Sequence, residues 1–222
     1  MGVPGNADLL LLRSAAATGG YQVERSLRFN SIDSAYLSRT PSSSGNRRTW
    51  TWAAWVKLGK LSNWGSLFKA GSANSSPTTQ LYLYSDNTLE YITYSGSTQS
   101  VLTTTQVFRD PSAWYHILLA VDTTLATADN RQRLYVNGVE ITAFTSRTNH
   151  SQNYDTFVNS SSYTHEIGRT TNIGGSSEKY FDGYLADVIF IDGQQLTPSS
   201  LVETSATTGQ LIPKAYTGSF GT

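Results

Sequence analysis

The chain has 222 residues, enough for one large or two small domains, and its 16 basic and 16 acidic side chains cancel. The lack of cysteine excludes disulfide scaffolds, thiolate zinc sites, iron–sulfur clusters and cysteine nucleophiles, and the balanced charge predicts no nucleic-acid surface. Only 14% of residues are charged while 12% are aromatic, and together with many Ser, Thr, Asn and Gly this composition favours strands and turns.

The amino-terminal residues differ from the rest of the chain. They contain an apolar run, Leu9, Leu10, Leu11 and Leu12, between glycine-bearing stretches. The run is too short for a membrane helix or for a signal peptide, and no cationic residue precedes it. We predict that residues 1–25 form an arm whose four leucines bind a neighbouring chain; the alternative is that they add an edge strand to their own sheet.

Alternation of apolar and polar residues predicts strands through the body of the chain. The predicted strands are 27–29, 50–56, 80–84, 89–94, 133–136, 139–141 and 184–191, and the nearly continuous apolar run 114–121 predicts a central strand. The neighbouring Ala53 and Ala54 break the alternation of the second, which indicates either a bulge or a strand buried on both faces. Asp86-Asn87 predicts a hairpin, and Asn137-Gly138 predicts a type I′ hairpin because both residues tolerate positive φ.

The remaining segments read as loops, apart from one short helix. Residues 197–203 are predicted to be helical, with Thr197 as the cap and Pro198 in the first turn. Residues 41–48, 71–79 and 149–162 are rich in Ser, Thr and Asn and are predicted to be surface loops. We therefore predict an all-β, two-sheet antiparallel jelly-roll sandwich over 26–205 with a tail at 206–222, which pairs either with the sandwich or with a neighbouring chain.

Catalytic and metal-binding patterns are not found. No strand carries Glu-x-Asp or Glu-x-Glu, and Asp182 and Asp187 are an odd number of residues apart, so a regular strand points them to opposite faces. A glycosidase carboxylate pair is therefore not expected. Loop acids such as Asp122, Asp129 and Asp155 could bind calcium, but their spacing is unspecific. We predict no enzyme activity, no catalytic residue, no metal and no cofactor.

Histidines are assigned to structural roles. His116 lies in an apolar strand and is predicted to be buried in the core, whereas His150 lies in a polar loop and is predicted to be solvated.

The tryptophans divide into strand and turn positions. Packing in the core explains Trp50, Trp52, Trp55 and Trp114, which all lie in predicted strands. Trp64 lies between Asn63 and Gly65 in a turn, so it is the best candidate for a glycan contact, although a lid over one end of the sandwich explains it equally well. Two further candidates for glycan contact are the loop tyrosines Tyr154 and Tyr163.

A series of motifs resembles a known sandwich family. The motifs are 114–117 (Trp-Tyr-His-Ile), 133–138 (Arg-Leu-Tyr-Val-Asn-Gly), 167–168 (Ile-Gly), 181–190 and 196–198 (Leu-Thr-Pro). Their order is similar to the laminin-G/pentraxin-like concanavalin A-type sandwich, and the likeness runs from Leu27 to Glu203. Residues 21–30, 33–41 and 45–52 also resemble virion proteins of tailed bacteriophages, which carry this sandwich in head-decoration, cement or fibre modules.

This resemblance implies a virion structural protein. We expect a capsid-decorating cement protein, made in the host cytoplasm, whose arm and sandwich edges bind the major capsid protein and other copies of the chain. A homo-oligomer is expected, and a trimer would suit local threefold positions of a shell. The alternative is a carbohydrate-binding receptor module of a tail fibre or capsid surface. Neither nucleic acid nor a membrane is an expected partner.

Overall fold

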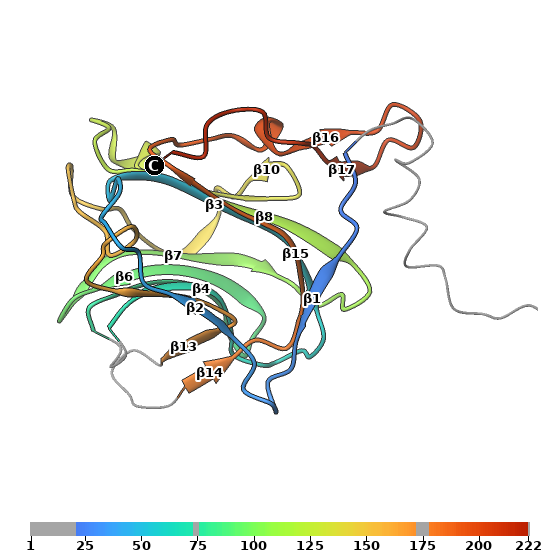
Figure 1. Ribbon diagram of the computed structural model, residues 1–222, viewed down its shortest axis with the longest axis horizontal. Helices are drawn as coiled ribbons and strands as arrows, with labels where there is room; N and C mark the ends of the chain where they lie inside the picture. The colour runs from blue at the N-terminus through green and yellow to red at the C-terminus, as the bar shows by residue number, and fades with distance from the viewer. Residues whose placement is uncertain (1–20, 73–75, 172–177, 222) are drawn as a thin grey trace, which may run out of the picture.

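The structure is a computed structural model that describes residues 21–72, 76–171 and 178–221, folded as two stacked antiparallel sheets (Figure 1). The six-stranded sheet runs, in order, β1 (Ser26–Phe29), β15 (Gly183–Asp192), β3 (Thr49–Leu58), β8 (Trp114–Asp122), β9 (Gln132–Val136) and β10 (Val139–Glu140). The seven-stranded sheet runs β11 (Phe144–Thr148), β7 (Thr98–Val107), β6 (Thr88–Tyr94), β5 (Thr78–Leu83), β4 (Gly65–Gly71), β12 (Thr164–Ile167) and β2 (Leu37–Arg39). The predicted jelly-roll sandwich is confirmed.

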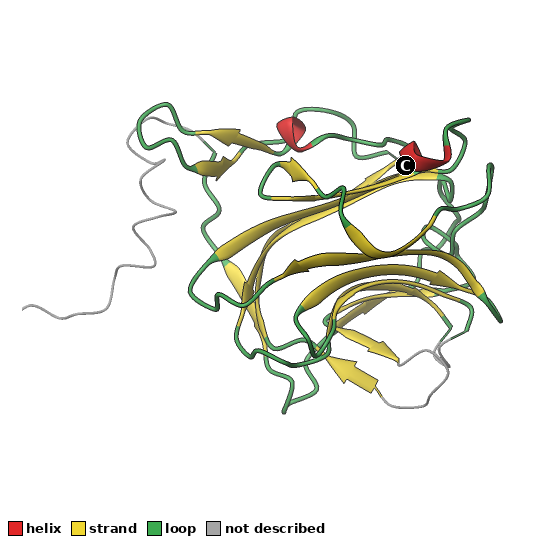
Figure 2. Cartoon of the chain, turned by 180° about the vertical axis from the view of Figure 1, so that it is seen from behind, coloured by secondary structure: helices red, strands yellow, loops and turns green. Residues whose placement is uncertain are grey.

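Two small hairpins lie on the outer faces of the sandwich. The pair β16 (Val202–Thr204) and β17 (Leu211–Pro213) lies over the six-stranded sheet, and the pair β13 (Arg169–Thr171) and β14 (Glu178–Tyr180) lies under the seven-stranded sheet (Figures 1 and 2). The end of the chain therefore pairs partly within its own molecule. The helical elements among the described residues are short 3-10 turns, Ala128–Asn130 and Pro198–Ser200.

Strand β3 is buried on both of its faces. It pairs with β8 without a register shift from Thr49 to Lys57, so Ala53 and Ala54 make no bulge in it. Its even-numbered residues point between the sheets, where Trp50 and Trp52 are almost fully buried. The odd-numbered residues point outward, and Ala53 and Trp55 belong to separate clusters there. Of the two alternatives that the sequence left open, the strand buried on both faces is confirmed.

Both predicted hairpins form with the expected turns. Strands β5 and β6 pair through a turn in which Asn87 has a φ of 68°. Strands β9 and β10 meet at Asn137 and Gly138, with φ values of 50° and 80°. Asn and Gly enter this left-handed region at low cost, which is why the sequence signal is reliable here.

The predicted helix at 197–203 is wrong. Only Pro198–Ser200 make a 3-10 turn, Thr197 makes no side-chain cap bond to the backbone, and Val202 already begins β16. A single turn orders several residues for one hydrogen bond, so pairing with β17 prevails over local helical preference. The sequence also missed β4 and the Thr-rich β7, whose burial comes from neighbouring strands rather than from a visible alternation.

Gly183 at the start of β15 is a sensitive backbone position. Its φ is +154°, and an added Cβ would lie 2.3 Å from the carbonyl oxygen of Lys57. Gly96 has a φ of +69°, but an added Cβ there meets nothing within 4 Å. We expect Gly183→Ala to lower the free energy of unfolding by about 2 kcal/mol more than Gly96→Ala, because only the first adds a backbone clash to the conformational cost.

Urea denaturation of both variants measures this difference. Equal losses in the two variants would contradict the strand register at Gly183.

Candidate functional site

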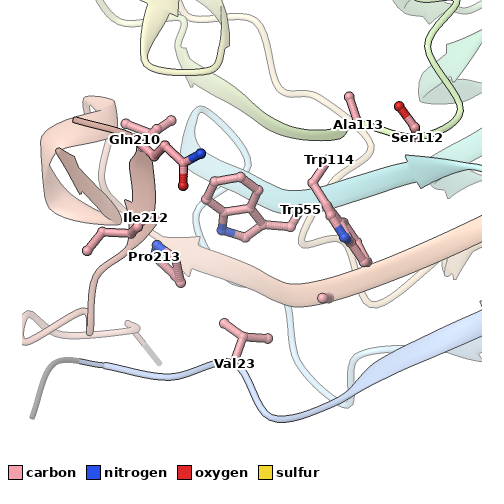
Figure 3. A pocket seen from close by; sticks show the side chains of 10 residues that line it. Val23, Trp55, Ser112, Ala113, Trp114, Gln210, Ile212 and Pro213 are labelled. Carbon is pink, nitrogen blue, oxygen red and sulfur yellow. The ribbon is translucent and has the colours of Figure 1, made fainter. Parts of the chain in front are cut away.

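A small pocket lies on the outer face of the six-stranded sheet; we call it the outer-face pocket (Figure 3). Its volume is about 190 Å³. The floor is formed by Trp55 of β3, Trp114 of β8 and Ala186 of β15, and the other walls by Val23 and residues 210–213. Figure 3 shows the Trp55 ring between Gln210 and Pro213 on one side and Trp114 on the other. Segments far apart in the sequence therefore meet around two indole rings.

The strand register explains why a pocket forms here. Alternation along β3 turns Trp55 away from the core that holds Trp50 and Trp52. Trp55 stands opposite Ala186 of β15 in the pairing register, and a small side chain beside an indole leaves space that the sheet does not fill. The β16–β17 hairpin covers this space from outside instead of filling it.

The lining of the pocket suits a neutral, partly apolar ligand. No lining side chain is charged. The indole Nε1–H of Trp55 is buried and has no hydrogen-bond partner among the described residues, and a buried N–H left in this state costs about 1–3 kcal/mol. An engineered cavity of about 150 Å³ binds benzene, so about 190 Å³ can hold one six-membered ring.

His116 lies next to this pocket and is buried, as predicted. Its ring centroid is 5.2 Å from that of Trp55, and its Nδ1 has no partner among the described residues. Burial lowers the pKa of His116 to about 4, so the imidazole is neutral near pH 7. The pocket consequently keeps an uncharged floor.

Trp64, the tryptophan singled out from the sequence, lies on the opposite side of the molecule. It precedes β4 and is half-buried among Tyr82, Tyr84 and Ile92 on the outer face of the seven-stranded sheet. Its ring stacks on Tyr84 with centroids 5.2 Å apart, and Lys179 Nζ lies 5.2 Å from its centroid. Trp64 therefore both covers the cluster and stays partly exposed, so its role as a glycan contact stays a prediction.

Tyr154 and Tyr163 lie in and beside the predicted loop at 149–162, away from Trp64. Tyr154 stacks on His150, and Tyr163 packs edge-on against Phe157. Tyr163 adjoins the end of β4 where Thr164 pairs with Gly71, whereas Trp64 adjoins the other end. Seven strand residues span about 20 Å, so the three predicted contact residues do not form one site.

His150 is not solvated, and that prediction is wrong. Its side chain is fully buried, and its Nε2 lies 2.8 Å from the hydroxyl oxygen of Tyr91. Burial first, and the Arg131 guanidinium second, lower the pKa of His150 to about 3. Arg131 also donates to the carbonyl oxygen of His150, which fixes the loop against the sheet. The polar neighbours of His150 in the sequence gave no sign of its burial, because the imidazole ring is covered by the way the loop folds and not by adjacent apolar residues.

Two buried glutamates of the seven-stranded sheet have protein partners. On the outer face of the seven-stranded sheet, Glu90 accepts hydrogen bonds from Tyr82 and Thr103, and Glu166 pairs with Lys69 and Arg169. The strands of the two glutamates, β6 and β12, are separated by β5 and β4. Three strand spacings amount to about 14 Å, beyond the ~5–9.5 Å between the carboxylates of glycosidases.

The loop acids considered for calcium are held by separate partners. Asp122 accepts hydrogen bonds from Thr49 and Thr124, Asp129 pairs with Arg147, and Asp155 pairs with Arg48. In the part of the chain that the structure describes, no three His, Asp or Glu side chains gather in a way that could hold a metal ion. The same residues contain no helix long and apolar enough to cross a membrane.

The predicted arm is not tested by the structure, and the outer-face pocket was not predicted from the sequence. Leu9, Leu10, Leu11 and Leu12 lie outside the described residues, so the arm stays a prediction. The pocket at Trp55, Trp114 and Gln210 was missed, because the sequence analysis assigned both tryptophans to core packing. A usable signal was present: the odd-numbered position of Trp55 on a strand whose even-numbered tryptophans fill the core.

Comparisons with known proteins identify the family to which this fold belongs. A family model described as the concanavalin A-like lectin/glucanases superfamily matches residues 32–202, whereas no curated protein matches significantly. A heptameric SAP-like pentraxin of Limulus polyphemus is 20% identical, with 78% of this chain and 77% of that chain covered and a TM-score of 0.53.

Two further solved structures are similar at lower identity. A candidate carbohydrate binding protein of Bacteroides ovatus is 15% identical, with 87% and 58% of the two chains covered and a TM-score of 0.55. Tailspike protein 2 of an Escherichia coli bacteriophage is 13% identical, with 84% of this chain and 24% of that chain covered and a TM-score of 0.53. The chain thus spans about a quarter of the tailspike. At these identities the likeness shows the fold.

The buried histidines predict a loss of stability in mild acid. The unfolded chain binds protons near pH 6.5, but His116 and His150 bind them only near pH 4 and pH 3 in the folded state. The unfolded state therefore holds more protons in this window, and stability falls as the pH drops from about 6.5 to about 4. The pKa values of Asp86 and Asp155 are lowered from 3.8, so these carboxyls titrate below the window.

Urea denaturation at several pH values measures the effect. The free energy of unfolding should fall by at least about 2 kcal/mol between pH 7 and pH 4, and His150→Gln should make this dependence shallower. An unchanged pH dependence in His150→Gln would contradict the burial of His150.

Proposed function

The chain belongs to the concanavalin A-like lectin/glucanases superfamily. From this premise we propose that it is a non-catalytic carbohydrate-binding module, which holds one ring of a neutral glycan in the outer-face pocket. The observation that carries the proposal is the buried, unpartnered Nε1–H of Trp55 in a pocket that a second indole, Trp114, also lines.

The pocket offers the two kinds of contact that a sugar ring needs. The C–H faces of a pyranose are apolar and can pack on the indoles of Trp55 and Trp114, which supply large contact area at low entropic cost. A sugar hydroxyl can accept the hydrogen bond that the Trp55 Nε1–H lacks, and the exposed Gln210 amide can both donate to and accept from a second hydroxyl.

The charge of the pocket selects the class of glycan. Its lining holds no cation that would pair with a carboxylate or sulfate group, and an unpaired charge moved into an apolar pocket is strongly unfavourable. We therefore expect neutral hexoses or N-acetylhexosamines to bind better than sialic or uronic acids.

Binding without hydrolysis is consistent with the arrangement of the acids. Glu90 and Glu166 lie too far apart for the two-carboxylate mechanism and are occupied by Tyr82, Lys69 and Arg169. Neither is among the residues that line the outer-face pocket. The carbohydrate-binding name of the similar Bacteroides ovatus protein agrees with the proposal.

Substitutions on the two sides of the molecule test the proposal. In a glycan array followed by titration calorimetry, Trp114→Ala should weaken binding of the best neutral glycan at least about tenfold, or about 1.4 kcal/mol. Gln210→Ala should weaken it less. The matched control is Trp64→Ala, which removes a half-buried tryptophan from the opposite face and should leave the affinity unchanged.

Three outcomes would overturn the proposal: no glycan bound by the unaltered chain, a loss of affinity in Trp64→Ala, Tyr154→Ala or Tyr163→Ala but not in Trp114→Ala, or a preference for acidic glycans. Thermal unfolding of each variant separates lost contacts from lost folding.

The capsid-decorating role is a finer proposal with separate support. It rests on the resemblance to phage virion proteins and on the apolar run at Leu9–Leu12, and the similarity to a phage tailspike agrees with a place on a virion. If the arm clamps a shell, deletion of residues 1–20 should abolish binding to purified capsids while the sandwich stays folded. Equal binding by the truncated chain would contradict this role.

A further inference from the structure

A second, larger groove opens between the two sheets at one edge of the sandwich; we call it the edge groove. Its volume is about 630 Å³. Figure 1 faces this edge, with β15 on the upper layer and β2 on the lower layer. The apolar part of the lining consists of Leu37, Pro41, Trp52, Phe68, Ile167, Val188, Phe190 and Phe220. Leu37 and Val188 remain 48% and 37% exposed, so the groove presents apolar surface to solvent.

Half of β15 has no strand beside it on the side of this groove. Strand β1 pairs only with residues 183–186 of β15. Farther along, Asp192 N–H donates to the carbonyl oxygen of Phe220, while Gly193 N–H donates to the carbonyl oxygen of Thr49, the first residue of β3. Because backbone groups alternate in direction along a strand, the N–H and C=O of Phe190 point to the same side as the N–H of Asp192. No described residue bonds to them there.

A second donor inside the groove also lacks a partner. Trp52 is 1% exposed, and its Nε1–H has no hydrogen-bond partner among the described residues. A free strand edge beside an apolar slot is the arrangement to which an extended peptide adds as a strand: the backbone bonds to the edge and apolar side chains enter the slot.

The position of Tyr21 indicates which peptide is available. Its hydroxyl donates to Asp187 Oδ1 at 2.8 Å, and Asp187 directly follows the part of β15 that β1 covers. Residues 1–20 lie outside the described part of the chain, and their sequence contains the apolar run Leu9–Leu12, which ends nine residues before Tyr21. Nine residues can span up to about 30 Å, and a tether of this length gives a high effective concentration.

We propose that the edge groove binds the Leu9–Leu12 segment of the same chain, as an extended strand added to the free half of β15. Buried leucines contribute about 1.5–3 kcal/mol each, and the strand supplies partners for the backbone of Phe190. This inference does not depend on glycan binding, which takes place on another face. It competes with the capsid clamp, because leucines held in their own groove are not available to a shell.

Amide hydrogen exchange of Phe190, followed by NMR on the full chain, tests the proposal. The double substitution Leu10→Asp and Leu11→Asp should raise the exchange rate of the Phe190 amide at least about tenfold, because the added strand is lost. The control Ala16→Asp places a charge in the same arm outside the leucine run and should leave the rate unchanged. Equal Phe190 rates in the unaltered chain and the double variant would overturn the proposal.

Trypsin cleavage after Arg13, next to Leu12, gives a second readout from the other side of the contact. Val188→Asp should speed this cleavage several-fold. Val139→Asp, a change at a 67% exposed valine of β10, should not. Equal cleavage rates in the two variants would overturn the proposal. Protection of Phe190 that rises with protein concentration, together with a dimeric mass in light scattering, would also overturn it and would assign the groove to the arm of a second copy.

Discussion

The alternation of β3 between two apolar environments is the constraint on which the rest of the molecule depends. The strand pairs with β8 on one side and β15 on the other, so it cannot slip by one residue without exchanging its two faces. The inward face places Trp50 and Trp52 among the core side chains of both sheets. The outward face presents Trp55, which needs the β16–β17 hairpin to cover it. One register thus determines both the core and the outer-face pocket.

The tryptophans of β3 differ in whether their polar atom is satisfied. Trp50 donates from Nε1 to Thr156 at 3.1 Å, and its place in the core explains it fully. Trp52 and Trp55 are also buried but have no such partner among the described residues, and each lines a depression. Buried N–H groups are rarely left unpaired, so on β3 these two positions are where an acceptor from a ligand or a further segment would be stabilising. The buried Nε1–H of Trp64 likewise has no partner among the described residues.

Sequence patterns predicted most of the architecture, because strands follow from the local alternation of apolar and polar residues and hairpins follow from turn residues. Asn137-Gly138, the run from Trp114 to Val121 and the strand ending at Asp192 all form as expected. The predictions from local sequence were wrong where tertiary contacts determine burial or secondary structure. His150 is polar in its sequence context but buried by the fold of its loop, and residues 202–204 form a strand only because 211–213 pair with them.

The candidate site was harder to predict from the sequence than the fold, because it too depends on tertiary contacts. Residues of a pocket come from separate segments, here Val23, Trp55, Trp114 and residues 210–213, and no spacing along the chain joins them. Trp64 was predicted as a glycan contact because it lies in a turn, yet its ring packs on Tyr84. The face to which a strand tryptophan points proved more informative than whether a tryptophan lies in a strand or a turn.

The most direct test of this account is the indole region of a ¹⁵N–¹H correlation spectrum, in which the five tryptophans give separate Nε1–H signals. Titration with a neutral hexose or N-acetylhexosamine should shift the Trp55 signal, because the sugar supplies its missing acceptor, and leave that of Trp50 in place. A spectrum in which Trp64 alone responds, or in which no indole signal moves, would contradict the assignment of the outer-face pocket.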